Sequence, residues 1–200
     1  MAGAGETREA LIAAARRLIP RLGWEGVSAR ALAAEAGVRS GVVHYHFESV
    51  SAVLRAAAAS ASEQVFGPPV EAMLASPTRA EGLTSLLAGL AALDRQGESV
   101  RLLFESALAS TRDAALREQT ADSVAALRVR IAEWLLPESG DQADLHAAII
   151  TAMLDGLLFQ QGVDAEAADA DPAAMARTLE IGMSGDSSTA PRSFPQGRNY

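Results

Sequence analysis

The amino-acid sequence predicts an all-α protein made of an N-terminal three-helix helix-turn-helix domain and a larger helical domain behind it. Apolar residues recur at helical spacing along most of the 200 residues. No segment shows the alternation of apolar and polar residues that marks a half-buried strand. Around Gly37, two short helical patterns meet across a glycine with the spacing of a helix-turn-helix. We expect one domain at residues 1–50, a second at 51–184, and a disordered tail rich in Gly, Ser and Pro at 185–200.

A proline marks the end of the first expected helix. Pro20 has no backbone N–H, and it disfavours helical geometry at Ile19. We therefore expect the first helix to kink or to stop early.

The helix-turn-helix follows directly. Its first helix carries one apolar stripe at positions i, i+3, i+4 and i+7, formed by Ala29, Leu32, Ala33 and Ala36. Gly37 stands where a left-handed residue ends the helix, and Val38 can fill the core at the turn. A second short helix then begins near Arg39 or Ser40.

The second domain opens with a long helix. Ser49 can cap it, and its apolar positions continue to Val65. The run Gly67-Pro68-Pro69 should break or bend this helix, with a short resumption at residues 70–74. After a turn at Ser76-Pro77, Thr78 and Glu81 form a capping box ahead of a leucine-rich helix.

The remaining elements are also helical. Residues 100–108 form one helix, and Ser110 or Thr111 can cap a long one that Pro137 stops. Asp141 opens the next helix. An acidic, loop-like connection at 163–174 ends in Asp171-Pro172, which supplies a capping acid and a first-turn proline to the last helix.

Charge is distributed unevenly between the N-terminal part of the chain and the rest. Residues 1–58 hold seven arginines against five acidic residues, whereas residues 59–200 hold ten arginines against twenty acidic residues. Lysine is absent from the whole chain, which has a net charge of −8. Any contact with nucleic acid is therefore expected in the N-terminal quarter and must use arginine as its side-chain cation.

The second helix of the helix-turn-helix is the expected reader of DNA, since the major groove admits one α-helix whose N-terminal residues approach the base edges. Arg39 can offer two donors to a guanine, and Ser40 can offer a hydroxyl. Gly41 permits close approach because it has no side chain. One turn further on, the hydroxyl of Tyr45 is placed for a phosphate contact.

The residues of this helix-turn-helix resemble those of a known protein family. The helix spacing, Ala36-Gly37-Val38, Gly41 and the run Tyr45-His46-Phe47 together resemble the DNA-binding domain of the TetR/AcrR family of regulators, over residues 6–58. The resemblance implies that the DNA contacts are Ser28, Arg30, Arg39, Ser40, Gly41, His44 and Tyr45. It implies structural roles for His46 and Phe47.

Pro20 is one departure from the family pattern, and two other positions also depart from it. Val50 stands where the family usually has a lysine against a phosphate, so one backbone contact is missing. Arg39 stands where a serine usually caps the recognition helix, which leaves Ser40 as the capping candidate.

The resemblance also implies a homodimer, since one helix-turn-helix reads only a few base pairs. The last two helices are the candidate dimer interface, and their candidate residues are Ile149, Met153, Leu157, Met175 and Leu179. Burial within one chain is the alternative explanation of these apolar residues.

The middle helices would then surround a cavity for a small, mainly apolar effector, lined by Phe66, Leu103, Phe104, Leu127, Ile131 and Trp134. Ordinary core packing is the alternative explanation of each of these six residues, and it is the more common one for residues of this kind. Arg101 and Glu105, on the same expected helix, would ordinarily form a solvated pair at i, i+4.

Other classes of protein fit less well. There is no cysteine, His44 and His46 point to different sides of a helix, and no phosphate loop, dinucleotide fingerprint or nucleophile elbow is present. We therefore expect no metal, no cofactor and no enzymatic activity. No apolar run reaches the roughly 20 residues of a membrane span, and the N-terminus does not resemble a signal peptide, so we expect no membrane partner and a cytoplasmic location.

The function expected from these observations is a DNA-binding transcriptional regulator, a repressor that a ligand releases from a pseudo-palindromic operator. Two alternatives remain open. One is a helical ligand-binding or adaptor protein whose DNA-binding domain has decayed, and the other is a small all-α enzyme.

Overall fold

The computed structural model describes residues 4–94, 96–163 and 171–184. Within these residues every regular element is a helix, which confirms the predicted fold class. The predicted disordered tail at 185–200 lies outside the described residues, as do positions 164–170 of the acidic connection. In chain order the elements are α1 (Ala4–Leu22), α2 (Ala29–Glu35), α3 (Gly41–His46), α4 (Val50–Leu74), α5 (Arg79–Ala91), α6 (Glu98–Ser110), α7 (Ala114–Ser139), the 3-10 turn η1 (Gly140–Gln142), α8 (Ala143–Val163) and α9 (Pro172–Ser184).

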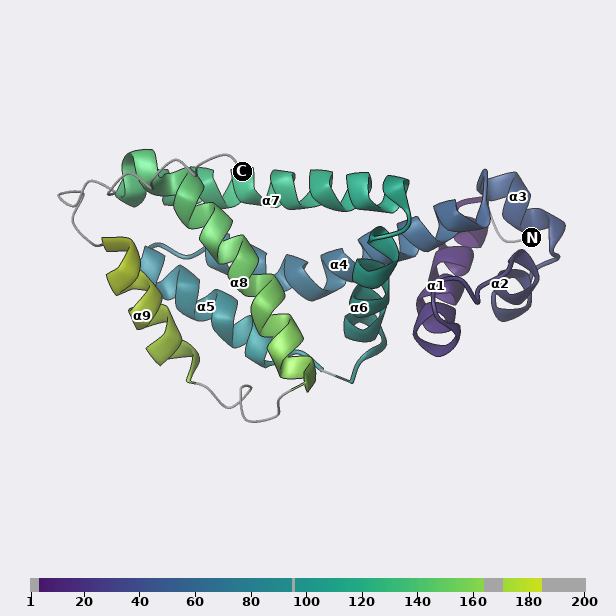
Figure 1. Cartoon of the computed structure of the whole chain (residues 1–200), viewed down its shortest axis with the longest axis horizontal. Coiled ribbons are helices and arrows are strands. Elements are labelled where there is room, and N and C mark those ends of the chain that lie inside the picture. Colours follow the sequence, from purple (N-terminus) through teal and green to yellow (C-terminus); the bar gives the residue numbers. More distant parts are fainter. Residues whose placement is uncertain (1–3, 95, 164–170, 185–200) are drawn as a thin grey trace, which may run out of the picture.

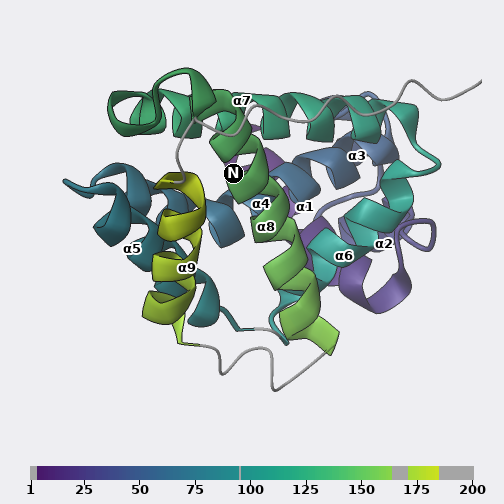
Figure 2. The same cartoon turned by 60° about the vertical axis from the view of Figure 1, so that its left-hand side comes forward.

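The molecule is elongated, with α1, α2 and α3 gathered at one end and α5, α8 and α9 at the other (Figure 1). The long helix α4 runs through the middle and contacts α1, α5, α6 and α7. The turned view in Figure 2 brings α8 and α9 in front of α4. One helix therefore connects the two ends of the molecule.

The described residues bury two large apolar cores and a smaller cluster. The first core joins α1, α2 and α3 to the N-terminal half of α4, and it also takes in Leu102, Ala109 and Leu116 from α6 and α7. The second core lies among the C-terminal part of α4, α5, α7, α8 and α9. Because α6 and α7 contribute to the first core, the N-terminal helices are packed against the body rather than tethered to it.

The turn between α2 and α3 follows its sequence signals. The Ser28 hydroxyl accepts a hydrogen bond from the backbone N–H of Ala31 at 3.2 Å, which caps α2. Gly37 has a positive φ of 68°, so the predicted left-handed residue is confirmed. The predicted cap at Ser40 is wrong, because its backbone is already helical (φ −57°, ψ −33°) and its side chain makes no capping hydrogen bond to α3.

The expectations that three prolines would stop or break a helix were wrong. α1 continues beyond Pro20 to Leu22, α4 is one helix through Pro68 and Pro69, and α7 continues beyond Pro137 to Ser139. A proline inside a helix costs about 3 kcal/mol or more. Tertiary burial offsets that cost here, since the residues on either side of the α4 prolines, among them Val65, Val70 and Met73, are buried.

Most of the remaining helix starts match their signals. Ser49, Thr78 and Asp171 each accept a hydrogen bond from a backbone N–H in the first turn of the helix that they precede, as predicted. The prediction for α7 was wrong, because Asp113 is its cap, and it accepts from the N–H of Leu116 at 3.0 Å. The Ser110 and Thr111 hydroxyls instead donate to carbonyl oxygens within α6. Asp141 lies in η1, and α8 begins two residues later.

Candidate nucleic-acid interface and ligand site

The predicted DNA-contact residues share one property, which is exposure to solvent. All seven are exposed, namely Ser28, Arg30, Arg39, Ser40, Gly41, His44 and Tyr45. Tyr45 is 81% exposed although it is a large aromatic residue. Val43 and Phe47 point the other way and are buried in the first core. One side of α3 is therefore packed against the first core, and the polar side chains on its outer side are exposed.

Two arginines of the N-terminal part are distinguished because they form neither an ion pair nor a side-chain hydrogen bond among the described residues. Of the seven arginines in residues 1–58, Arg8, Arg17, Arg21 and Arg55 form ion pairs with acidic residues. Arg16 forms hydrogen bonds with Ser60, Gln64 and Ser99. Within the part of the chain that the structure describes, Arg30 and Arg39 form neither an ion pair nor a side-chain hydrogen bond. Their guanidinium groups are available for phosphates and bases.

The paired arginines have a structural role. Arg17 Nε lies 2.5 Å from a carboxylate oxygen of Glu35, and Arg21 approaches the same carboxylate at 3.9 Å, which ties α1 to α2. The hydrogen bond from Arg17 lowers the pKa of Glu35, and the charges of both arginines add to this effect. Glu35 therefore stays ionised and neutralises two cations beside the reader.

Ser28 and Tyr45 can each make the contacts predicted for them. Ser28 uses its oxygen as an acceptor for the α2 cap, so its hydroxyl proton can still donate to a phosphate. The Tyr45 ring packs edge-on against His46, with ring centroids 5.0 Å apart and an interplanar angle of 87°. The half-buried His46 thus supports the exposed Tyr45 side chain.

The six predicted effector residues lie on α4, α6 and α7, and they divide between two apolar clusters. Ile131 is fully buried in the second core, and Phe66, Leu127 and Trp134 pack against that core. Leu103 and Phe104 pack, with Phe66 again, against the small cluster of Val65, Val100 and Leu158. These contacts describe packed side chains, and the assignment of the six to an effector stays a prediction.

The predicted dimer residues divide between two faces. Ile149 is 45% exposed, while Met153, Leu157, Met175 and Leu179 are half-buried and pack against the second core. Exposed residues of α8 recur at i, i+4, i+7, i+11 and i+14, and they are Leu145, the predicted Ile149, Ala152, Gly156 and Phe159. Sequence reasoning missed Leu145, Ala152 and Phe159, although their spacing was visible in the sequence. On α9, Ile181 is 75% exposed.

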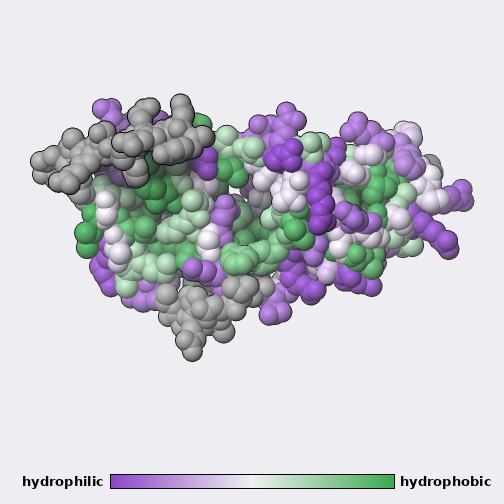
Figure 3. Space-filling view, in the orientation of Figure 1, coloured by the Kyte–Doolittle hydropathy of each residue, from purple (hydrophilic) through white to green (hydrophobic). Residues whose placement is uncertain are grey.

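We call the five α8 residues and Ile181 the α8–α9 apolar face. In Figure 3, apolar residues gather over the half of the molecule that holds α5, α8 and α9. Exposed apolar patches of this kind usually mark an interaction surface. Gly156 has no atom within 4 Å of an added Cβ, so a partner helix could approach closely there.

The described residues lack two other features. They contain no group of three or more His, Cys, Asp or Glu residues that could hold a metal ion. None of their helices is both long enough and apolar enough to cross a membrane.

Comparison with known proteins gives two family matches. Residues 11–57 match the family model of bacterial regulatory proteins of the tetR family. Residues 77–181 match the model of the C-terminal domain of tetracyclin repressor-like proteins. No curated protein shows significant sequence similarity to the chain.

Solved structures share the fold. A protein of Pseudomonas aeruginosa PAO1 assigned to the transcriptional regulators is 23% identical with a TM-score of 0.74, and the match covers 88% of this chain and 89% of that one. A transcriptional regulator from Rhodococcus sp. Rha1 is 20% identical with a TM-score of 0.73, covering 90% and 98%. The multidrug binding protein EbrR, whose crystal structure is a complex with imidazole, is 25% identical with a TM-score of 0.67, covering 91% and 97%.

Proposed function

The chain belongs to the TetR family of bacterial regulatory proteins, and we propose that it is a transcriptional repressor that binds a pseudo-palindromic operator as a homodimer. In this proposal a small, mainly apolar effector binds among α4, α6 and α7 and releases the protein from DNA. Members of the family are DNA-binding regulators rather than enzymes. Family membership does not by itself give the operator, the repressor role or the release by a ligand. These three points are the proposal.

The exposed reader carries the proposal. Arg39 and Arg30 form neither an ion pair nor a side-chain hydrogen bond among the described residues, whereas each of the other five arginines of residues 1–58 forms one or the other. Leaving two guanidinium groups and the Tyr45 hydroxyl unpaired on one surface supports a role in binding a polyanion. In a DNA-binding domain that had lost its function, nothing would favour exposed arginines without partners over paired ones.

Dimerisation is supported by the α8–α9 apolar face. A two-fold dimer uses the same surface of both protomers, so a self-complementary apolar stripe is what such an interface requires. Ala152 and Gly156 in the middle of the stripe would let two copies of α8 pack closely. The second reader of a dimer would then meet the second half of a pseudo-palindromic site.

Effector binding is supported by the aromatic and aliphatic character of the predicted residues. EbrR is a multidrug binding protein with the same fold. By analogy, a ligand that prefers one of two arrangements of the dimer would shift the population toward it and weaken operator binding by the ratio of its two affinities.

The test is fluorescence anisotropy of the full chain with labelled duplexes from the region upstream of its own coding sequence, at two salt concentrations. We expect one duplex to bind with a dissociation constant on the order of 10 nM and with marked salt dependence. The Arg39→Ala/Tyr45→Ala variant should lose this binding. Arg128→Ala, which removes an exposed arginine from α7, should bind as the unchanged chain does.

The opposite result would be weak binding to every duplex, unchanged in the Arg39→Ala/Tyr45→Ala variant. A selection from random duplexes would then decide whether any operator exists. If it yields no preferred sequence, the adaptor function replaces the repressor function.

A further inference from the structure

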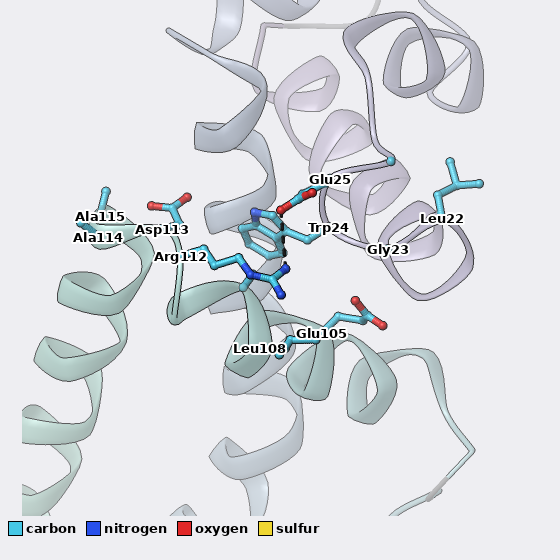
Figure 4. Close-up of a pocket in the computed structure, with 12 residues that line it drawn as sticks. Leu22, Gly23, Trp24, Glu25, Glu105, Leu108, Arg112, Asp113, Ala114 and Ala115 are labelled. Carbon is cyan, nitrogen blue, oxygen red and sulfur yellow. Dashed lines mark ion pairs between the residues drawn. The ribbon is translucent and has the colours of Figure 1, made fainter.

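A cavity of about 680 Å³ opens where the N-terminal helices meet the body of the molecule (Figure 4). One wall is the connection between α1 and α2, with Trp24 and Glu25. The other wall is the corner between α6 and α7, with Glu105, Leu108 and Arg112. We call it the junction cavity. It is separate from the predicted effector site, because none of the six predicted effector residues lines it.

The walls of the junction cavity combine an aromatic ring with carboxylates. Trp24 is half-buried and packs against the first core, so its ring is held in place and still faces the cavity. Leu108, which is 56% exposed, adds a second apolar surface. Figure 4 shows the Trp24 ring beside the ion pair of Glu25 and Arg112, with Glu105 on α6 on the other side of Arg112 in this view. An aromatic face with nearby carboxylates attracts organic cations, through the ring quadrupole and through direct charge attraction.

Glu105 provides the free negative charge. The sequence led us to expect a pair between Glu105 and Arg101, but Arg101 donates instead to the carbonyl oxygen of Pro20 at 3.1 Å. Within the described residues the half-buried Glu105 carboxylate forms no ion pair and no hydrogen bond. One of its oxygens lies 3.9 Å from the position of a Cβ at Gly23, so it borders the connection between α1 and α2.

The other charged groups of the cavity are already engaged. Glu25 and Arg112 form an ion pair at 3.7 Å across the cavity, and they neutralise each other. Asp113 accepts the capping hydrogen bond of α7 and keeps its negative charge. The charge that remains for a ligand is therefore negative, and among the described residues the Glu105 carboxylate is the one in this lining without an ion pair or hydrogen bond.

We propose that the junction cavity is a binding site for an organic cation with an aromatic or otherwise apolar body, held by Trp24, Leu108 and Glu105. The volume lies in the range of about 300 to 1,000 Å³ that is usual for small-molecule sites. The cationic centre lies against the Glu105 carboxylate and the Trp24 ring, and the apolar body covers Leu108. The site is distinct from the effector site of the proposed function, and it requires a charged ligand where that site takes a mainly apolar one.

A ligand in this cavity touches both halves of the molecule at once. The α1–α2 connection belongs to the N-terminal domain, whereas α6 and α7 belong to the body. Polar contacts between these two parts include those from Arg101 to Pro20, from Arg112 to Glu25 and from Arg16 to Ser99. A bound cation adds a further link between the N-terminal domain and the body.

The test uses tetraphenylphosphonium as the probe and isothermal titration calorimetry of the full chain in the absence of DNA. Glu105→Gln removes the charge at nearly constant shape, and Trp24→Leu removes the ring but keeps an apolar side chain. We expect each change to weaken binding by about tenfold, the size of one desolvated cation–π or ionic contact. Glu98→Gln, at the exposed start of the same helix, is the matched control and should bind as tightly as the unchanged chain.

Tetraphenylborate, which has nearly the same shape and the opposite charge, should not compete for the site. The proposal is overturned if the unchanged chain does not bind tetraphenylphosphonium, if Glu105→Gln and Trp24→Leu bind it as tightly as the control, or if tetraphenylborate binds equally well. Circular dichroism of each variant establishes that it is folded before titration. Because the readout contains no DNA, failure of the operator experiment leaves this result unaffected.

Discussion

Truncating the α8–α9 apolar face should dissociate the proposed dimer, and the size of the effect can be worked from exposure. Ile149 is 45% exposed and Phe159 is 57% exposed in the single chain. Full burial of such side chains contributes roughly 1.5–3 kcal/mol, so covering the exposed half contributes about 1 kcal/mol for each. A two-fold interface contains each residue twice. The Ile149→Ala/Phe159→Ala variant should therefore lose about 4 kcal/mol per dimer, which raises the dissociation constant about a thousandfold.

Sedimentation equilibrium over a dilution series measures this dissociation constant directly. The matched control is Val129→Ala/Leu136→Ala, which truncates two equally exposed apolar residues of α7 (57% and 58%) that lie outside the face. Thermal unfolding of both variants establishes that the protomer is intact. If the control pair dissociates the dimer as much as the test pair does, or if neither changes it, the face assigned here is not the interface.

Three further predictions concern single residues. Ser28→Ala removes the α2 cap and should lower the free energy of unfolding in urea by about 1 kcal/mol, whereas Ser28→Asn, an equally good cap, should retain most of it. Gly82→Ala would place a Cβ 2.4 Å from the Trp134 ring and should cost about 1–3 kcal/mol in the same assay, while Gly182→Ala, with open space around it, should cost nothing. Burial lowers the pKa of His146 below 6.5, and the charge of a nearby arginine adds to this. The unfolded chain therefore binds more protons than the folded chain as the pH falls through about 6.5, so the melting temperature should drop as the pH is lowered through that region, and should drop less in His146→Gln.

The helix-turn-helix could be predicted from the sequence because its determinants are local. The Ser28 cap, the positive φ of Gly37 and the burial of Val43 and Phe47 all involve residues within a few positions of one another. Short-range rules of capping and periodicity are sufficient for such an element. The exposure of the contact residues then follows from which side of α3 is buried.

The prolines show where local rules fail. Pro69 packs so closely against α5 that a Cβ at Gly89 would lie 2.9 Å from its ring. Residues 69 and 89 belong to different helices, and no pattern in either one reveals this contact. The free energy from such packing keeps α4 intact, and it is absent from any estimate made on the helix alone.

The junction cavity lay beyond sequence reasoning for a related reason. Trp24 and Glu105 are separated by most of the first half of the chain, and their meeting depends on how α6 packs against α1. The expected partner of Glu105 was Arg101, at the ordinary helical spacing. Arg101 donates a hydrogen bond to the carbonyl oxygen of Pro20 instead, and it can do so only because the fold brings α1 beside α6.

The continuity of α4 has a mechanical consequence. Its 25 residues make a rod of roughly 37 Å, and only residues 47–49 separate it from α3. A rod of that length that pivots by ~5° at its far end displaces its near end by ~3 Å, close to the ~3.4 Å between successive nucleotides of one DNA strand. Had the two prolines broken this helix, a joint would absorb such a rotation. In the proposed repressor, an unbroken α4 would carry a rotation of a few degrees at α5 to α3 as a displacement of about one base step.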